Sequence, residues 1–129
     1  MGNRTVSGQG TVLAPATPST TFIPLTRWVN SATVVSVRAI LEIQGISANC
    51  TIVPAYQVTN TPDNPPTTGT AISTWATKNA AGMYFGTMDS FSAIVTGSRA
   101  VRFGVHVTTT GTTSGLGAWV ALLVQIQTP

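Results

Sequence analysis

The sequence predicts an all-β fold: an antiparallel β-sandwich, jelly-roll-like or immunoglobulin-like, with an extended N-terminal arm. Three observations lead to this prediction. Apolar and polar residues alternate over several segments, which is typical of strands with one buried face. Turn signals rich in Gly, Pro and Asn separate these segments. No segment has helical periodicity, and Thr, Val, Gly and Pro are frequent throughout the 129 residues.

The first 21 residues differ from the rest of the chain. They consist mainly of Gly, Thr, Ser and Pro, with one apolar pair, Val12-Leu13. So few apolar residues cannot bury much surface by themselves. We therefore expect an extended arm over residues 1–21 and a single sandwich domain over residues 22–129, which begins with the apolar segment TFIPLTRWV.

The first clear strand lies at residues 34–44, where apolar residues alternate with polar ones and Ile40 is the one apolar residue on the polar side. Residues 50–59 predict a returning strand, in which Pro54 breaks the hydrogen-bond ladder and indicates an edge strand or a bulge. The segment NTPDNPPTTG at residues 60–69 predicts a stiff, exposed loop.

The second half of the chain continues the pattern. Strand character resumes at residues 70–77, an irregular crossing follows at residues 78–89, and residues 90–97 predict a short strand. Residues 98–110 alternate clearly. The last strand, residues 116–127, has one apolar face, and Trp119, Ala121 and Leu123 make its other face apolar too, which predicts a strand covered on both sides. A long connection, TTTGTTSGLG, joins these last two strands.

Charge is the most informative part of the composition. Only 7% of the residues are charged, against about 25% in an ordinary globular domain. The net charge of +3 comes from six scattered basic and three acidic residues, so the sequence lacks the basic patch of a nucleic-acid binder. A surface of Thr, Ser, Asn and Gln with few charges suits a protein that packs against other subunits.

Residues that could carry chemistry are few, so we expect neither an enzyme nor a cofactor or metal site. The single histidine, His106, lies on the polar face of a strand, and the single cysteine, Cys50, lies in an apolar stretch. Three acids spread along the chain predict neither a carboxylate pair nor a calcium site. No apolar run is long enough for a membrane helix, and the start lacks the apolar core of a signal peptide.

Exposed aromatic residues leave open a second function, that of a carbohydrate-binding sandwich module such as those of phage tails or fibres. Such modules stack sugar rings on aromatic side chains. Trp75, which lies near the proline-rich loop, is the first candidate for this role. The competing interpretation is that Trp75 packs in the core or at an interface, as most tryptophans do.

The chain resembles the small all-β auxiliary head proteins of tailed bacteriophages, called decoration or cement proteins. The resemblance is one of overall character. It lies in the arm MGNRTVSGQGTVLAPATPSTT and in the strands SVRAILEIQG…TIVPAYQVTNTPDNPP and RAVRFGVHVTTTG…GAWVALLVQIQ. It implies a structural virion protein on the capsid surface, made in the host cytoplasm, that clamps neighbouring coat subunits.

The resemblance also implies partners. These are the major capsid protein or other virion subunits and further copies of this chain in a dimer or trimer, without direct contact to nucleic acid or membrane. A small main coat protein is the alternative within the same class. The arm and the two long loops supply six candidate intersubunit contacts, which are Val12, Leu13, Asp63, Thr110, Thr113 and Leu116, and Trp75 is the seventh.

Overall fold

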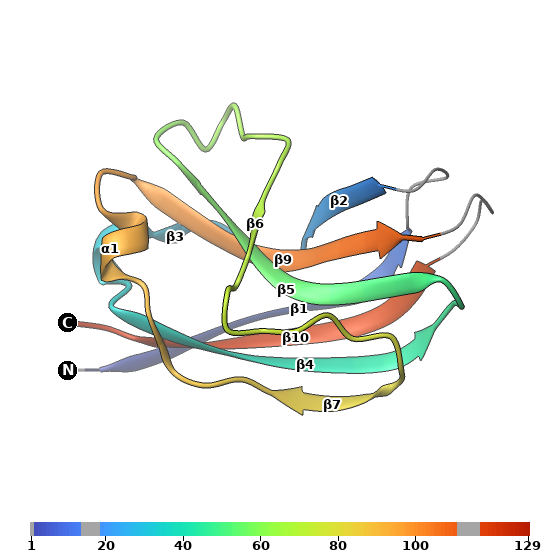
Figure 1. The fold of residues 1–129 in the computed structure, drawn as a ribbon. Helices are drawn as coiled ribbons and strands as arrows, with labels where there is room; N and C mark the ends of the chain where they lie inside the picture. Colours follow the sequence, from blue (N-terminus) through green and yellow to red (C-terminus); the bar gives the residue numbers. More distant parts are fainter. Residues whose placement is uncertain (1, 14–18, 111–116) are drawn as a thin grey trace.

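The computed structural model describes residues 2–13, 19–110 and 117–129, and it confirms the antiparallel β-sandwich. Two sheets face each other (Figure 1). The first, here called the β10 sheet, has the order β1-β10-β4-β7, with β8 also paired to β4. Its strands are β1 (Asn3–Leu13), β10 (Gly117–Gln127), β4 (Ser36–Ile46), β7 (Gly82–Phe85) and β8 (Asp89–Ser90).

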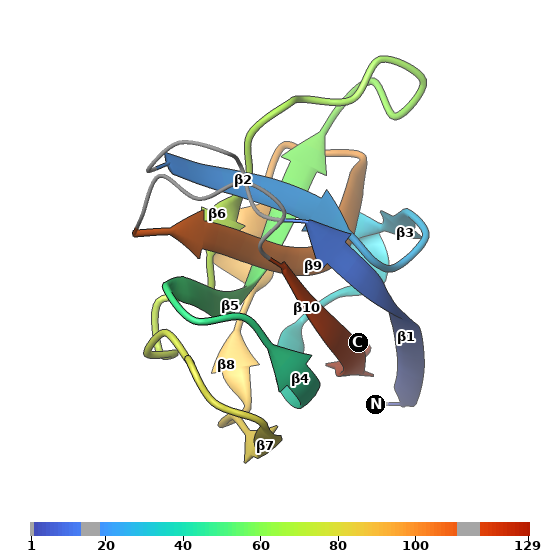
Figure 2. The same cartoon turned by 90° about the vertical axis from the view of Figure 1, so that its right-hand side faces the viewer.

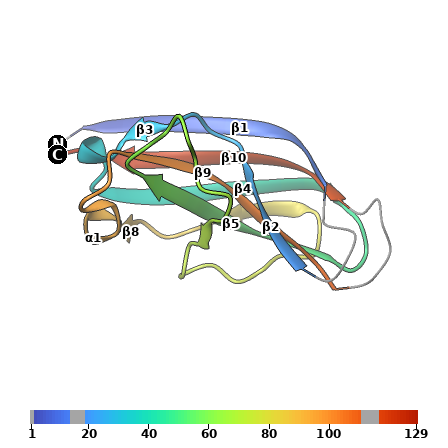
Figure 3. The ribbon, with the colours of Figure 1, turned by 90° about the horizontal axis from the view of Figure 1, so that it is seen from above.

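The second sheet, here called the β9 sheet, has the order β2-β9-β5-β6, with β3 also paired to β9. Its strands are β2 (Ser19–Pro24), β9 (Ala100–Thr109), β5 (Cys50–Thr59), β6 (Thr70–Ala71) and β3 (Val29–Asn30). The two sheets are seen end-on in Figure 2. The two ends of the chain lie side by side (Figure 3), where the Thr128 amide donates to the Gly2 carbonyl at 2.8 Å.

The core lies between the sheets and is built by the alternating strands. Every second residue of β10 is buried there, as the alternation predicts, and so are the matching residues of β4 and β9. An aromatic cluster closes one end of the core, where Phe91 contacts Tyr56 at 5.0 Å and Phe103 at 5.9 Å between ring centroids. Such edge-to-face and tilted pairs stabilise a core beyond the area that they bury.

The N-terminal segment forms part of the sandwich, in contrast to the arm expected over residues 1–21. Residues 3–13 form β1, which pairs with β10 along its whole length, and Val6 and Val12 enter the core. Low apolar content led to the expectation of an arm. Pairing with a strand of equal length stabilises such a segment because the backbone groups of both strands satisfy each other.

Three further expectations are corrected. The irregular crossing predicted at residues 78–89 contains the regular strand β7, which pairs with β4. Within residues 90–97, where a strand was predicted, Ser92–Val95 form a short helix, α1. Phe91 and Val95 are four residues apart and bury the same side of this turn. A second short helix, η1 (Ser31–Thr33), follows β3. Of residues 70–77, only Thr70–Ala71 form a strand.

Pro54 lies in β5, and its surroundings explain how the sheet tolerates it. Both backbone hydrogen bonds of Ile52 go to Lys78, on the side of β5 away from β9. Because residues two apart in a strand point their backbone groups to the same side, the Pro54 nitrogen faces that side too. There β5 pairs with the two-residue strand β6, so the missing donor falls where the sheet is sparsely paired. β5 lies between β9 and β6, which corrects the alternative that Pro54 marks an edge strand.

One segment, residues 23–26, connects the two sheets at close range. The amides of Leu25 and Thr26 both donate to the Phe103 carbonyl at 3.0 Å. A Cβ atom on Gly104 would lie 2.0 Å from the Ile23 carbonyl oxygen, and one on Gly8 in β1 would lie 1.8 Å from the Leu25 carbonyl oxygen. Glycine is therefore required at both positions by close backbone approach.

We predict that Gly104→Ala lowers the free energy of unfolding by about 3 kcal/mol, because the added methyl group meets a backbone oxygen that cannot rotate away. Urea unfolding at pH 7 measures this loss. Gly45→Ala is the matched control, since a Cβ atom there meets nothing within 4 Å. That control should stay within about 0.5 kcal/mol of the wild type. Equal stability of the two variants would contradict the close approach of residues 23–26.

Candidate functional site

The outer face of the β10 sheet, which points away from the core, carries an apolar surface that crosses three strands. Strand pairing aligns Leu123 with Ile40 and Ile40 with Phe85, on β10, β4 and β7 in turn. The neighbouring row aligns Ala121, Glu42 and Met83 on the same strands. Directly opposite residues on one face of a sheet contact each other, so these rows form one continuous surface.

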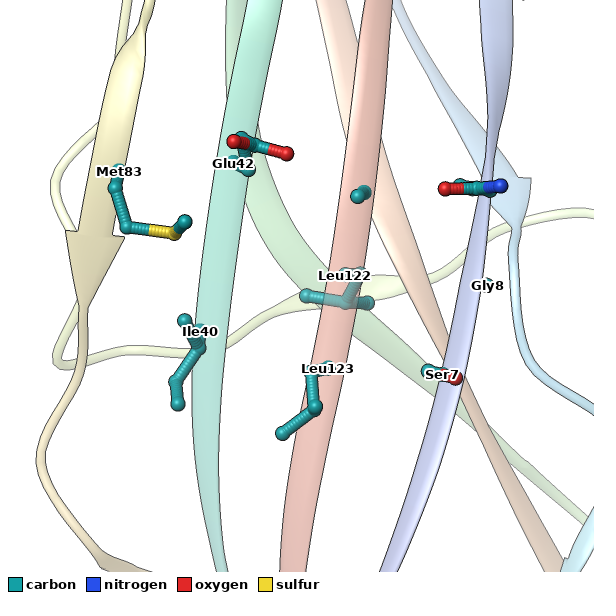
Figure 4. A pocket seen from close by; sticks show the side chains of 9 residues that line it. Ser7, Gly8, Ile40, Glu42, Met83, Leu122 and Leu123 are labelled. Carbon is teal, nitrogen blue, oxygen red and sulfur yellow. The ribbon is translucent and has the colours of Figure 1, made fainter.

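This face is uncovered. Phe85 is 63% exposed, Met83 52% and Leu123 36%, and no described segment lies below the sheet in the view of Figure 1. Figure 4 shows Met83, Ile40 and Leu123 on their three strands, around a shallow hollow of about 260 Å³ that Glu42 also lines. The sequence predicts a covered second side for β10, whereas among the described residues nothing of this chain covers it.

Polar residues border the apolar surface. The outward residues of β1 are Thr5, Ser7, Gln9 and Thr11, which are all exposed. Two charges lie on β4 on either side of Ile40. The Arg38 Nε donates to the Gly86 carbonyl at 2.9 Å, and its guanidinium lies 5.8 Å from the Phe85 ring centroid. Glu42 accepts a hydrogen bond from Gln44 at 3.1 Å. An apolar centre with a polar rim is the usual anatomy of a protein interface.

The outer face of the β9 sheet contrasts with this one, because the loop between β5 and β6 covers part of it. The Gln57 amide donates to the carbonyls of Pro66 and Thr68, both at 3.0 Å. Phe22 is buried against Gly69, where an added Cβ would lie 2.4 Å from its ring. The Phe22 ring also meets His106 edge-to-face, with 5.9 Å between the centroids. The described part of the chain thus shields one outer face and leaves the other open.

The predicted contact residues are dispersed over the molecule. Val12 is 1% exposed and belongs to the core, which corrects its assignment as a contact. Leu13 is 65% exposed at the end of β1. Asp63 is exposed in the loop after β5. Thr110 is exposed after β9, where its amide donates to the Asn49 carbonyl at 2.9 Å. Thr113 and Leu116 lie outside the described residues.

Trp75, the first candidate for sugar stacking, is half-buried and packs against the core. Its ring lies against Gly86, where an added Cβ would come within 2.6 Å of the indole Nε1. The Lys78 ammonium lies 5.9 Å from its ring centroid. Among the described residues, the tryptophan that is exposed is Trp119, at 41%, beside the Leu13 end of β1. Trp75 is therefore held by its own chain on more than one side.

Groups that could carry chemistry lie apart in the described residues. No three His, Cys, Asp or Glu side chains among them come together as a metal site. Burial raises the pKa of the Cys50 thiol, which keeps it in the unreactive protonated form. None of the described helices is long and apolar enough to cross a membrane.

The residues of the open face were not identified as contacts from the sequence, although the sequence contains apolar residues at positions where a half-exposed strand would have polar ones. Ile40 is the apolar exception on a polar face, Trp119 and Leu123 make the second side of the last strand apolar, and Met83 and Phe85 flank Tyr84 at a spacing of two. Each of these residues breaks or extends the alternation. We interpreted them as core or crossing residues because the sequence does not reveal which strands are neighbours.

Comparison with known proteins supports the fold. No family model matches the chain, and no curated protein matches it. Among solved structures, a chain of the infectious bursal disease virus VP2 subviral particle is 12% identical with a TM-score of 0.53, over 97% of this chain and 32% of that chain. A chain of the T13 particle of the same virus is 8% identical with a TM-score of 0.56, over 97% and 31%.

A chain of the cyanophage Pam1 capsid asymmetric unit is 13% identical with a TM-score of 0.42, over 97% of this chain and 84% of that chain. The protein spans about a third of the length of the virus chains with the higher scores. At these identities, the comparison establishes the β-sandwich fold.

We predict that the stability of the folded chain falls as the pH is lowered below the ordinary histidine pKa of 6.5. Burial lowers the pKa of His106, against a smaller opposite effect of its backbone hydrogen bond with Gly69. Between the two pKa values the unfolded chain binds more protons, so the free energy of unfolding decreases with falling pH. Urea unfolding from pH 8 to pH 5 measures this slope.

His106→Gln should remove that part of the slope, because glutamine does not titrate. Above pH 7 the wild type and the variant should show the same pH dependence. A slope that persists unchanged in the variant below pH 6.5 would show that the loop over residues 60–69 does not shield His106.

Proposed function

We propose that this chain is a non-enzymatic structural subunit of a virus particle, and specifically a decoration protein that binds the assembled head of a tailed bacteriophage and stabilises contacts between coat subunits. The observation that carries the proposal is the uncovered apolar outer face of the β10 sheet. Contiguous exposed apolar surface on a small protein marks a site of interaction with another protein.

Composition supports the same conclusion. A chain with 7% charged residues has little electrostatic repulsion to keep copies apart, so an open apolar face is tolerated best when an assembly covers it. The solved chains with the higher similarity scores come from virus particles, and this chain matches about a third of each of them.

The proposed mechanism is multivalent attachment. Its partners are the major capsid protein or other virion subunits, and the chain makes no direct contact with nucleic acid or membrane. An oligomer that touches several coat subunits gains effective concentration without strong individual contacts. The exposed loop that contains Asp63, the Leu13 end of β1 and the exposed Thr110 remain available for these contacts.

We predict that this chain is present in many copies on virus particles purified by density gradient from a culture that carries its gene. Mild denaturant should release the chain while the shell stays closed, because a decoration protein binds a shell that is already assembled. Quantitative mass spectrometry and electron microscopy of the same fractions measure both results. Absence of the chain from purified particles would contradict the proposed function. Collapse of the shell on release would identify a main coat protein instead.

Rebinding to stripped particles tests whether the open face contributes. Phe85→Asp should weaken rebinding by at least about tenfold, because it places a charge in the apolar centre. Ile94→Asp is the matched control, since Ile94 is 37% exposed in α1 and lies outside this face. The control should rebind like the wild type, and equal rebinding of both variants would exclude the open face from attachment.

A further inference from the structure

We infer that a second copy of this chain covers the open face, in a two-fold dimer in which the β10 sheets of both copies stack. This inference rests on the proposed assembly role and names the partner of its site. The occupant is indicated by the order of three residues along β4, where Arg38, Ile40 and Glu42 follow each other on the outer face.

This order is complementary to itself. A two-fold axis that runs across the strands at the level of Ile40 turns one β4 antiparallel to the other. Arg38 of one copy then faces Glu42 of the second copy, and Glu42 faces Arg38 of the second copy. An isologous interface requires this kind of self-complementary arrangement, because each contact occurs twice.

The apolar residues occupy the positions that the same axis brings together. Leu123, Ile40 and Phe85 form one row across three strands, so each lies near the axis and meets its own counterpart. The two oppositely charged pairs then lie on either side of an apolar centre. Apolar contacts at the centre, with polar groups around them, are typical of stable interfaces.

The hydrogen bonds of Arg38 and Glu42 within the chain fit this arrangement. Arg38 donates from its Nε to the Gly86 carbonyl, and Glu42 accepts from the Gln44 amide. The contact of the Arg38 guanidinium with Phe85 places it at the border of the apolar row. Both side chains are half-buried and still reach the outer face.

The size of the face is sufficient for a specific dimer. With strands about 4.8 Å apart and a rise of about 3.3 Å per residue, the paired strands present about 600 Å² of flat area before side-chain relief is added. Standard interfaces bury about 600–1,000 Å² on each partner. Face-to-face sheets pack about 10 Å apart with interdigitating side chains.

Sedimentation equilibrium of the purified chain at several concentrations tests the inference. The wild type should be a dimer. Arg38→Glu and Glu42→Arg should each weaken the dimer by at least about tenfold, because each places like charges opposite each other twice. The double variant Arg38→Glu/Glu42→Arg should regain the wild-type dimer, and so should an equal mixture of the two single variants.

Arg27→Glu is the matched control for Arg38→Glu, since Arg27 is exposed outside this face and carries the same charge change. Circular dichroism confirms that each variant is folded. If Arg38→Glu does not fold, Glu42→Arg alone tests the charge pairing between the two copies, because this variant keeps the hydrogen bond from Arg38 to Gly86. A wild type that is monomeric at all concentrations overturns the inference, and so do single variants that dimerise like the wild type.

This experiment uses the chain alone and therefore separates the two proposals. A monomer that is nevertheless found on virus particles overturns the second copy as the occupant and leaves the proposed function standing. A charge-dependent dimer that is absent from particles overturns the proposed function and leaves the dimer.

Discussion

The structure depends on β10, an eleven-residue strand that is apolar on both faces and is paired along both edges. Its inward residues form the middle of the core, between the matching residues of β4 and β9. Its two neighbours, β1 and β4, are held in place by its backbone ladder. The same strand brings Leu123 and Ala121 to the outer face. One strand thus contributes both to the core and to the surface that requires a partner.

The two outer faces of the sandwich differ in how far other described segments of the chain cover them. On the β9 sheet, the loop between β5 and β6 lies over Phe22, Gln57 and His106 and satisfies the polar group of Gln57. On the β10 sheet, Phe85 and Met83 stay exposed. A chain that can cover one face with its own loop and leaves the other apolar face open is suited to associate through the open one. This contrast, together with the low charge, carries the proposed role as an assembly subunit.

Sequence reasoning identified the strands with regular alternation, because a period of two is the direct consequence of a half-buried strand. The strands at residues 34–44, 98–110 and 116–127 were predicted within two residues of their ends. β1 was missed because pairing with β10 stabilises it, and the residues of β1 do not indicate which strand they pair with. The turn of α1 was missed because Phe91 and Val95 fit a strand and a helix equally well over so few residues.

The candidate site was predictable in part. The second apolar side of β10 and the exception at Ile40 were visible in the sequence, yet their position side by side with Phe85 follows only from the pairing of β10, β4 and β7. Val12 was taken for a contact residue because its segment was expected to lie outside the sandwich. The order of strands in a sheet decides which distant segments lie side by side, and the alternation of apolar and polar residues does not determine that order.

The central claim is that protein covers the open face when the chain assembles. Hydroxyl-radical footprinting of Met83 tests it, with oxidation of Trp28 as the internal reference. Trp28 lies away from the open face, where the Arg102 guanidinium of the β9 sheet lies 4.4 Å from its ring centroid. We expect Met83 to be oxidised readily in dilute solution and to become protected relative to Trp28 as the concentration rises. If the ratio of Met83 oxidation to Trp28 oxidation is the same at every concentration and on the assembled particle, no protein covers the open face.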